Sequence, residues 1–362
     1  MNVGEQGTTN VTCIYPGPHD VMSEEHYLPV SLGTFEGMEP LRDRVCRSCN
    51  EKLGNELEVQ FTRAGPTGFF RWIVGIPGRD GLPPSPFYHG AGGTQPIFMI
   101  GRPDWAPYDL LAETDPGQRG AFACRQIIFQ DVSGATHPVP VPNAMRDRPD
   151  LLRRRLQRLR LEKAKPVYVV AGADETEWMG ALIQGLGGCL AGEWEVPVGE
   201  PQRIPLNAKV NVTSAYFRAI AKIVFHYTLA MFPDFTGLER EFDDIKAFIW
   251  SGGADDVDQF VRQRPDQFVE QFRRGWRPTH WMHILAVKRE RRRLTGYAQF
   301  FAGPAFLPQG YEVRLGGNPA RIISRLQWRA HQFVILNPTA SSGPHGKMED
   351  CEPVEHIWPF AR

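Results

Sequence analysis

Helical periodicity of apolar residues is clearest in the second half of the chain. Between Thr213 and Phe232 the apolar residues form a broad face, which predicts the longest core helix. The segment from Gly237 to Gly252 predicts a second helix, whose inward positions are Phe242, Ile245, Phe248 and Ile249. From Leu151 to Lys163, leucines recur at helical spacing among arginines. That pattern predicts a basic amphipathic helix.

Short apolar blocks predict strands in the preceding region. Glycine and proline are concentrated between Pro66 and Pro142, a density that excludes long helices there. Within this stretch three apolar runs predict short strands joined by turns, namely FFRWIVGI from Phe69, PIFMIG from Pro96 and RQIIFQDV from Arg125.

The remaining elements are predicted after residue 165. A strand from Pro166 leads into a helix over Thr176 to Leu186, and a short strand begins at Gln332. The segment from His283 predicts a hairpin whose charged middle is its solvated end. These elements predict an α+β fold with three regions: an N-terminal module of residues 1–62, a β-rich region of residues 63–149 and a mixed α+β region of residues 150–362.

Composition restricts the class of protein. The 362 residues are 42% hydrophobic and 23% charged, which excludes global disorder. The 41 Lys and Arg balance 41 Asp and Glu, so binding to a polyanion would depend on local basic clusters. The densest clusters are residues 151–163 and 288–293.

Cysteine usage and hydropathy predict the compartment. Six cysteines are too few for a disulfide scaffold, and the start of the chain lacks the charged and apolar regions of a signal peptide. The most apolar segment, Ala219 to Phe232, is interrupted by Lys222 and His226, so no membrane span is expected. We therefore expect a soluble, cytoplasmic protein with reduced thiols.

The specific chemistry is concentrated near the N-terminus. Cys46 and Cys49 form a C-x-x-C pair directly followed by Asn50 and a stretch compatible with a helix. Two thiolates at that spacing can chelate one tetrahedral zinc ion, with Cys13 reaching it from the preceding hairpin. In so short a segment, a metal would replace missing hydrophobic stabilisation.

These residues resemble the zinc-stapled branch of the HNH endonucleases, which have a ββα-metal core. The resemblance covers about 40 residues, from Cys13 to about Gly54, and includes the stretches SEEHYLP and VCRSCNEKLG. It implies that His26 is the general base that activates water. It also implies that Asn50 and Glu25 are ligands of a catalytic divalent cation.

The chain departs from the family pattern at the zinc site. Pro16 stands where the family has the second cysteine of its first pair, so three thiols remain unless His19 is the fourth ligand. Glu25 and His26 are adjacent, and neighbours in a regular strand face opposite sides. Glu24 is therefore the alternative acidic ligand if the strand is regular.

The chemistry of the residues agrees with the implied function. A phosphodiester hydrolase needs a base that titrates near neutral pH, which histidine supplies, and a hard cation beside the phosphate. Oxygen ligands suit Mg²⁺ or Mn²⁺, and thiolates suit Zn²⁺. The expected function is a metal-dependent HNH endonuclease acting on DNA. The alternative is a noncatalytic, zinc-stabilised nucleic-acid-binding protein. A third interpretation, a sensor in the C-terminal part that gates a nuclease, has no motif to support it.

Overall fold

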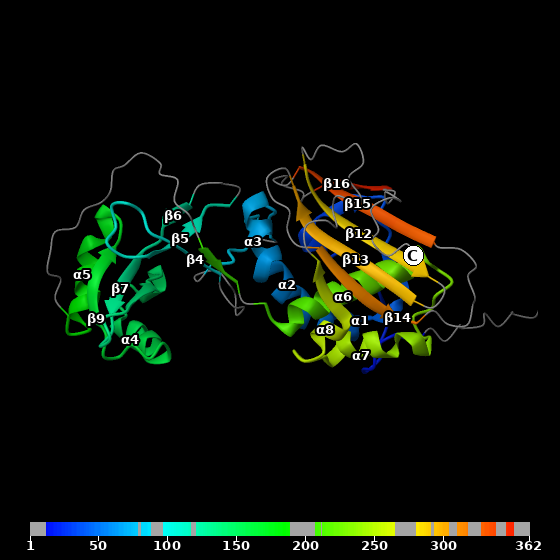
Figure 1. Ribbon diagram of the computed structural model, residues 1–362, viewed down its shortest axis with the longest axis horizontal. Coiled ribbons are helices and arrows are strands. Elements are labelled where there is room, and N and C mark those ends of the chain that lie inside the picture. The colour runs from blue at the N-terminus through cyan, green and yellow to red at the C-terminus, as the bar shows by residue number, and fades with distance from the viewer. Residues whose placement is uncertain are drawn as a thin grey trace, which may run out of the picture. The chain divides into compact units, whose positions relative to one another are not determined.

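The structure is a computed structural model of the chain, in which helices and strands form a mixed α+β fold (Figure 1). It divides into two compact units: residues 1–84 with 212–362, and the inserted residues 85–211. The residues that the structure describes are 12–78, 81–87, 97–116, 121–188, 207–210, 212–264, 280–290, 293–303, 310–317, 327–337 and 345–350. The division differs from the three predicted regions, because the first unit joins the two ends of the chain.

A sheet of seven described strands forms one layer of the first unit. Its order is β11-β14-β13-β12-β15-β16-β2, and every pair is antiparallel except β16 with β2. The strands are β11 (Val261–Arg264), β14 (Gly310–Gly316), β13 (Arg293–Ala302), β12 (Trp281–Glu290), β15 (Gln327–Asn337), β16 (His345–Asp350) and β2 (Thr34–Glu36). An N-terminal strand thus extends a sheet that the C-terminal part of the chain builds.

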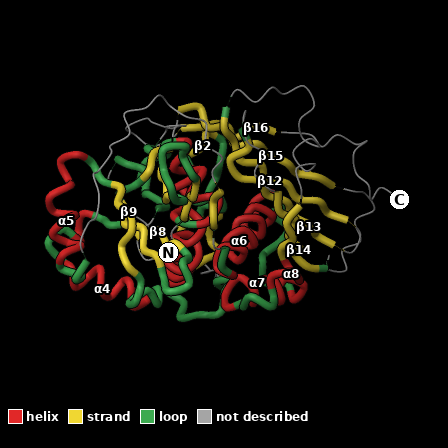
Figure 2. The backbone as a smooth tube through the Cα atoms, turned by 60° about the vertical axis from the view of Figure 1, so that its left-hand side comes forward, coloured by secondary structure: helices red, strands yellow, loops and turns green. Residues whose placement is uncertain are grey.

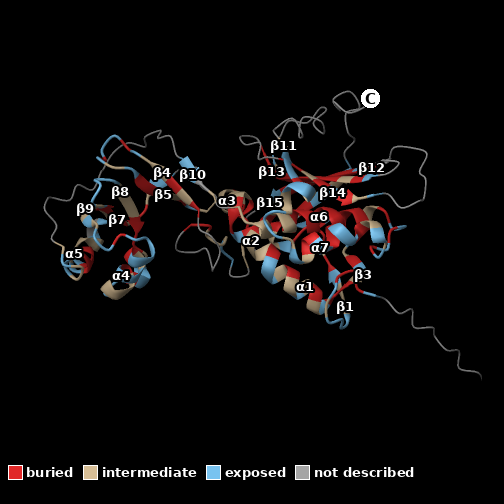
Figure 3. Cartoon of the chain, turned by 60° about the horizontal axis from the view of Figure 1, so that its bottom comes forward, coloured by how far each residue is buried: buried red, intermediate tan, exposed pale blue. Residues whose placement is uncertain are grey.

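Helix α6 (Ser214–Met231) is the central element of the first unit. It contacts β12, β13 and β14 of the sheet and also the N-terminal helices. Residues 219–229 are all buried (Figure 3). Such burial is typical of a helix that is enclosed on every side and not of an amphipathic surface helix. Gly296 of β13 permits the close approach, because a Cβ there would lie 2.0 Å from Val224 Cγ1. The predicted core helix is confirmed.

The N-terminal segment contains a hairpin followed by helices. Strands β1 (Met22–Glu25) and β3 (Leu41–Cys46) are antiparallel, with a short 3-10 helix η1 (Val30–Leu32) between them. Helix α1 (Arg47–Leu53) begins directly after β3 and continues through a π-helical turn, η2 (Gly54–Glu58), into α2 (Val59–Arg63).

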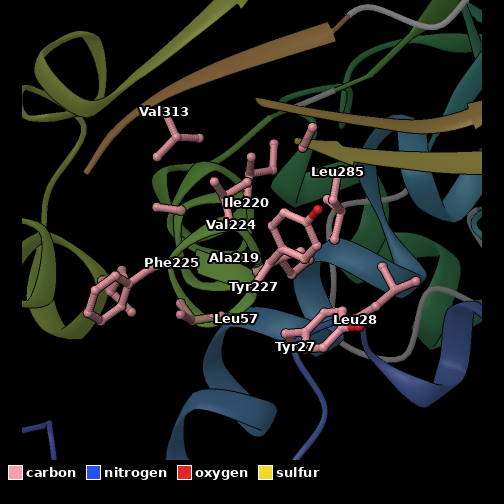
Figure 4. Close-up of a cluster of buried hydrophobic side chains, with 14 of the residues drawn as sticks. Tyr27, Leu28, Leu57, Ala219, Ile220, Val224, Phe225, Tyr227, Leu285 and Val313 are labelled. Atoms are coloured by element: carbon pink, nitrogen blue, oxygen red, sulfur yellow. The ribbon is translucent and has the colours of Figure 1, made fainter. Parts of the chain in front are cut away.

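This segment does not have a core of its own. Tyr27, Leu28 and Leu57 lie in the same hydrophobic cluster as residues of α6 and of the sheet, such as Leu285 and Val313 (Figure 4). The described part of the predicted N-terminal module, residues 12–62, therefore packs into one large core. The expectation that a metal replaces missing hydrophobic stabilisation does not match this packing.

The run predicted as a strand from Phe69 is instead helix α3 (Gly65–Val74). Pro66 lies in its first turn, where the missing N–H costs nothing, and Gly65 has a positive φ of 61°. Gly75 ends the helix in the left-handed conformation and donates to the carbonyls of Arg71 and Trp72. Here proline and glycine delimit a helix instead of excluding one.

The remaining helices of the first unit follow α6. The predicted second helix is confirmed as α7 (Asp243–Ser251), preceded by the 3-10 turn η5 (Arg240–Phe242). Helix α8 (Val257–Phe260) leads into β11. The predicted strand from Gln332 is confirmed as part of β15.

The hairpin predicted from His283 is confirmed as β12 and β13, but its charged residues are not all solvated. Lys288 is 8% exposed and Arg289 is 4% exposed. Arg289 Nη1 lies 3.1 Å from Asp234 Oδ2, and its guanidinium lies over the rings of Phe232 and Phe235. Residues that follow α6, including Phe232 and Phe235, therefore cover the side chain of Arg289. Arg291 and Arg292 lie outside the described residues.

The described strands of the second unit form two small sheets, of order β10-β4-β5-β6 and β8-β7-β9. The strands predicted from Pro96, Arg125 and Pro166 are confirmed as β4, β7 and β9, and the two predicted helices as α4 and α5 (Figure 2). The elements are β4 (Phe98–Gly101), β5 (Leu110–Thr114), β6 (Ala121–Ala123), β7 (Gln126–Gln130), β8 (Thr136–Pro140), η3 (Asn143–Met145), α4 (Pro149–Arg158), β9 (Lys165–Val170), η4 (Ala173–Glu175), α5 (Thr176–Gln184) and β10 (Asn207–Lys209).

None of the described helices combines the length and apolarity that a membrane crossing requires.

Candidate functional site

The first hairpin and α1 together have a ββα arrangement. The pairing of β1 with β3 is irregular: Ser23 opposes Val45 and Glu25 opposes Leu41, so three residues of β3 face one of β1. Asp43, in the middle of this bulge, has a left-handed φ of 55°, which Asp tolerates better than most side chains. The irregularity therefore lies in β3, opposite the segment of β1 that carries Glu24 and Glu25.

Cys13, His19, Cys46 and Cys49 form one cluster that could hold a metal ion. Each contributes one ligand atom, and these atoms all lie within 4.8 Å of one another. Cys46 Sγ lies 3.8 Å from His19 Nδ1. Sulfurs in a tetrahedral zinc site are about 3.8 Å apart, so a contraction of at most about 1 Å would close the cluster on an ion. The predicted site lacks the cysteine that Pro16 replaces, and His19 lies close enough to the three thiols to be the fourth ligand.

Local structure explains how three of these residues meet. Cys46 ends β3 and Cys49 lies in the first turn of α1, so their side chains are on one helix face. The Ile14 N–H donates to Arg44 O at 2.9 Å, which joins the segment carrying Cys13 to β3. The Cys46 N–H donates to Cys13 Sγ at 3.4 Å.

His19 is fixed by contacts on both sides. Ser48 Oγ donates to Pro18 O at 2.6 Å, and the Ser48 N–H donates to Asp20 Oδ1 at 3.1 Å. Gly17 lets the chain pass the cluster closely, because a Cβ there would lie 3.0 Å from Cys49 Sγ. These contacts of the loop before β1 therefore hold His19 beside the cysteines.

The thiols do not ionise equally. Burial disfavours the thiolate of Cys46, but hydrogen bonds with Ser48, with His19 and with nearby backbone outweigh this and lower its pKa to about 6. Burial raises the pKa of Cys13 and of Cys49, and the neighbouring sulfurs add to the effect. Without a cation, the cluster therefore holds one thiolate near neutral pH. A divalent cation would supply the charge that ionises all three.

Two of the predicted catalytic residues are accessible. His26 directly follows β1 and is partly exposed. Asn50 on α1 is also partly exposed, and its Nδ2 donates to Ser23 Oγ at 3.3 Å, while Ser23 Oγ donates to Val45 O at 2.9 Å. This bond orients the amide of Asn50 against β1. Among the described residues no donor occupies its Oδ1, which is the atom that could bind a cation.

Glu25 lies in a buried polar network. It is 3% exposed, and Lys222 of α6, itself 1% exposed, donates to its carboxylate and to that of Glu58. His226 Nδ1 lies 3.3 Å from Glu25 Oε1, and His226 Nε2 is hydrogen-bonded to Tyr15 Oη at 2.8 Å. The network therefore joins β1, the end of η2 and α6 inside the core.

The charges in this network are largely compensated. Burial opposes ionisation of Glu25, but Lys222 outweighs it, with His226 contributing, and the pKa of the carboxyl falls to about 2. The pKa of Lys222 is raised although burial lowers it, because Glu25 and Glu58 favour the ammonium. Burial lowers the pKa of His226 and keeps it neutral. A cation that bound Glu25 would have to displace Lys222.

The alternative acidic residue lies outside the core. Glu24 is exposed and Glu24 Oε1 lies 3.3 Å from Arg42 Nη2. Glu24 and Glu25 thus point to different environments, as alternation along a strand requires. The structure leaves Glu24 free to reach solvent, whereas Glu25 is enclosed.

The sequence analysis did not assign a role to Lys222, His226 or Glu58. The signal was present, because Lys222 and His226 are polar residues four positions apart within the most apolar segment of the chain. Buried charges of this kind need partners, and helical spacing places the two on one face.

Comparison with known proteins identifies no family: no family model, no curated protein and no solved structure matches the chain. The assignment of a function therefore depends on the residues and geometry of the ββα segment.

Proposed function

We propose that the chain is a metal-dependent endonuclease of the HNH type, which hydrolyses phosphodiester bonds of DNA. One observation carries the proposal. Asn50, on the helix of a ββα segment, is hydrogen-bonded to Ser23 of β1, and Ser23 lies three residues before His26. A base after the first strand and an amide on the helix are the arrangement that the resemblance implies.

His26 would take the proton from the attacking water. An imidazole is suited to this role at neutral pH, and a positioned general base contributes about 10²–10⁴-fold to the rate. Asn50 Oδ1 would hold Mg²⁺ or Mn²⁺, which would neutralise charge that develops on the phosphate. Among the acidic residues, either Glu25 or Glu24 would complete this site.

The Cys13, His19, Cys46 and Cys49 cluster would hold a separate, structural Zn²⁺. Three thiolates and one imidazole match the preference of zinc and not that of Mg²⁺. The ion would join the loop before β1 to the start of α1. It would thereby fix the helix on which Asn50 lies.

The second candidate is a noncatalytic, zinc-stabilised nucleic-acid-binding protein. The burial of Glu25 and its ion pair with Lys222 favour it, because the acidic residue beside the predicted base is engaged in the core. In that case Glu25 and Asn50 would only stabilise the hairpin.

Plasmid nicking distinguishes the two candidates. The wild-type protein, carrying its zinc, is incubated with supercoiled DNA with and without added Mg²⁺ or Mn²⁺. The proposal expects nicking only with added cation, and a loss of at least about 10²-fold in His26→Ala with DNA binding retained. His280→Ala, which alters an exposed histidine elsewhere, is the matched control. A wild-type protein that binds DNA but nicks with neither cation would support the noncatalytic candidate.

The acidic ligand is tested in the same assay. Glu24→Gln should abolish nicking without loss of stability if Glu24 binds the cation, because its side chain is exposed. Glu25→Gln should destabilise the protein in either case. Full activity in Glu24→Gln would leave Glu25 as the ligand.

A further inference from the structure

Helix α4 of the second unit carries the densest concentration of basic residues that the structure leaves exposed. Between Arg146 and Lys165 nine residues are basic and three are acidic, in a chain of net charge zero. The competing cluster at the β12–β13 hairpin is reduced by burial, because Lys288 and Arg289 are enclosed. The structure therefore distinguishes two clusters that look equivalent in sequence.

The basic residues of α4 face away from the core of their unit. Leu152 and Leu156 are buried against β7, β8 and α5. Successive helical residues are rotated by about 100°, so Arg154 and Arg158 point to the side opposite these leucines. Both arginines are exposed.

Neither of these two arginines forms an ion pair among the described residues, although Arg154 is close enough to Asp150, one helical turn earlier, to lower the pKa of that carboxyl. Many other arginines are paired with carboxylates, as Arg148 is with Asp150 and Arg264 with Glu312. Within the described part of the chain, no carboxylate lies within ion-pair distance of Arg154 or Arg158. Two exposed arginines four residues apart, neither of them held in an ion pair, leave a positive face available to an anionic polymer.

We propose that this face of α4 binds the phosphate backbone of a nucleic-acid duplex. A lipid surface is less suited to it, because a membrane-bound amphipathic helix needs an exposed apolar face, and here Leu152 and Leu156 are buried. Arginine is the side chain best suited to phosphate, since its guanidinium can donate two parallel hydrogen bonds. The proposal concerns binding alone and does not require that the chain cleave DNA.

The test measures binding under conditions in which cleavage does not occur. Fluorescence anisotropy of a short labelled duplex, without added Mg²⁺ or Mn²⁺, gives the dissociation constant at salt concentrations from about 50 to 200 mM. The double variant Arg154→Gln with Arg158→Gln should bind more weakly at low salt. Its plot of log K against log[salt] should be shallower by up to about 1.8, or about 0.9 for each lost phosphate contact.

A matched control removes the same charge elsewhere. Arg262→Gln with Arg314→Gln alters two exposed arginines on β11 and β14 and should leave the slope unchanged. Duplex DNA and duplex RNA in separate arms identify which phosphate backbone is preferred. No binding by the wild type, equal slopes for the wild type and the α4 variant, or binding only to vesicles containing phosphatidylserine would each overturn the proposal. Retained binding without nicking would contradict the nuclease function and leave this inference intact.

Discussion

Replacing Lys222 by Met removes the cation that pairs with Glu25 and Glu58 in the buried network of the first unit, while keeping the length of the side chain. Lys222 is 1% exposed and contacts both Glu25, which is 3% exposed, and Glu58. Its loss leaves one carboxylate fully buried and one partly buried without their counter-charge. Breaking a buried ion pair by removing one partner typically costs about 3–5 kcal/mol.

That cost is a large part of the stability of an ordinary domain, about 5–15 kcal/mol. For a unit of this size, 1 kcal/mol lowers the melting temperature by about 2–4 °C, so Lys222→Met should lower it by about 6–20 °C. Thermal unfolding followed by circular dichroism measures this change. The triple variant Lys222→Met, Glu25→Gln and Glu58→Gln should recover much of the loss, because the charges of this ion-pair network are then removed together.

Lys246→Met is the matched control. Lys246 also lies on a helix and pairs with a carboxylate, at 3.0 Å from Asp243 Oδ1, but that carboxylate is 61% exposed. Lys246 itself is 10% exposed, but Asp243 stays solvated when the ammonium is removed, so the control should lower the melting temperature much less than Lys222→Met does. Equal effects of Lys222→Met and Lys246→Met would refute the reasoning that the network is a buried, mutually compensated set of charges.

Three further predictions concern the metal, pH and packing. About one zinc ion per chain should copurify. Mass spectrometry of the metal content should show that zinc is lost in His19→Ala but not in the control His137→Ala. Zinc retained in both variants would exclude His19 as a ligand. Burial lowers the pKa of His283 to about 3, so the unfolded state binds the proton first. The free energy of unfolding should therefore fall by about 1.4 kcal/mol per pH unit as the pH is lowered from about 6.5 towards about 3. His283→Leu should lack this contribution, and urea titrations with the same pH dependence for both proteins would contradict it. Gly296→Ala places a Cβ 2.0 Å from Val224 Cγ1 and should cost about 1–3 kcal/mol in urea unfolding, partly restored by Val224→Ala; an unchanged stability would show that α6 and β13 can separate.

The metal cluster shows which ligands local sequence spacing brings together and which it does not. Cys46 and Cys49 are neighbours because i and i+3 positions meet on a helix, so their pairing followed from sequence. Cys13 and His19 join them only through the docking of a preceding loop on β3 and α1. The sequence made His19 a candidate, and its distance of 3.8 Å from Cys46 came from the tertiary structure.

Position in the fold, rather than residue type, decided which acidic residue is exposed and which is buried. Glu24 and Glu25 are adjacent and chemically equivalent in sequence, yet one is exposed and the other is enclosed with Lys222. The partner comes from a helix almost two hundred residues later in the chain. No local pattern contains that contact.

The sequence by itself determined the elements whose signals are local: the basic helix α4, the core helix α6, the hairpin β12–β13 and the ligand types of the metal cluster. Periodicity and residue chemistry are properties of neighbouring positions, so they can be interpreted without a fold. Only the tertiary structure decided that β2 joins a C-terminal sheet, that the described residues 12–62 share its core and that Arg289 is buried while Arg154 is exposed. Each of these depends on which distant segments pack together, and the free energy of that packing is a property of the whole unit rather than of any short stretch of sequence.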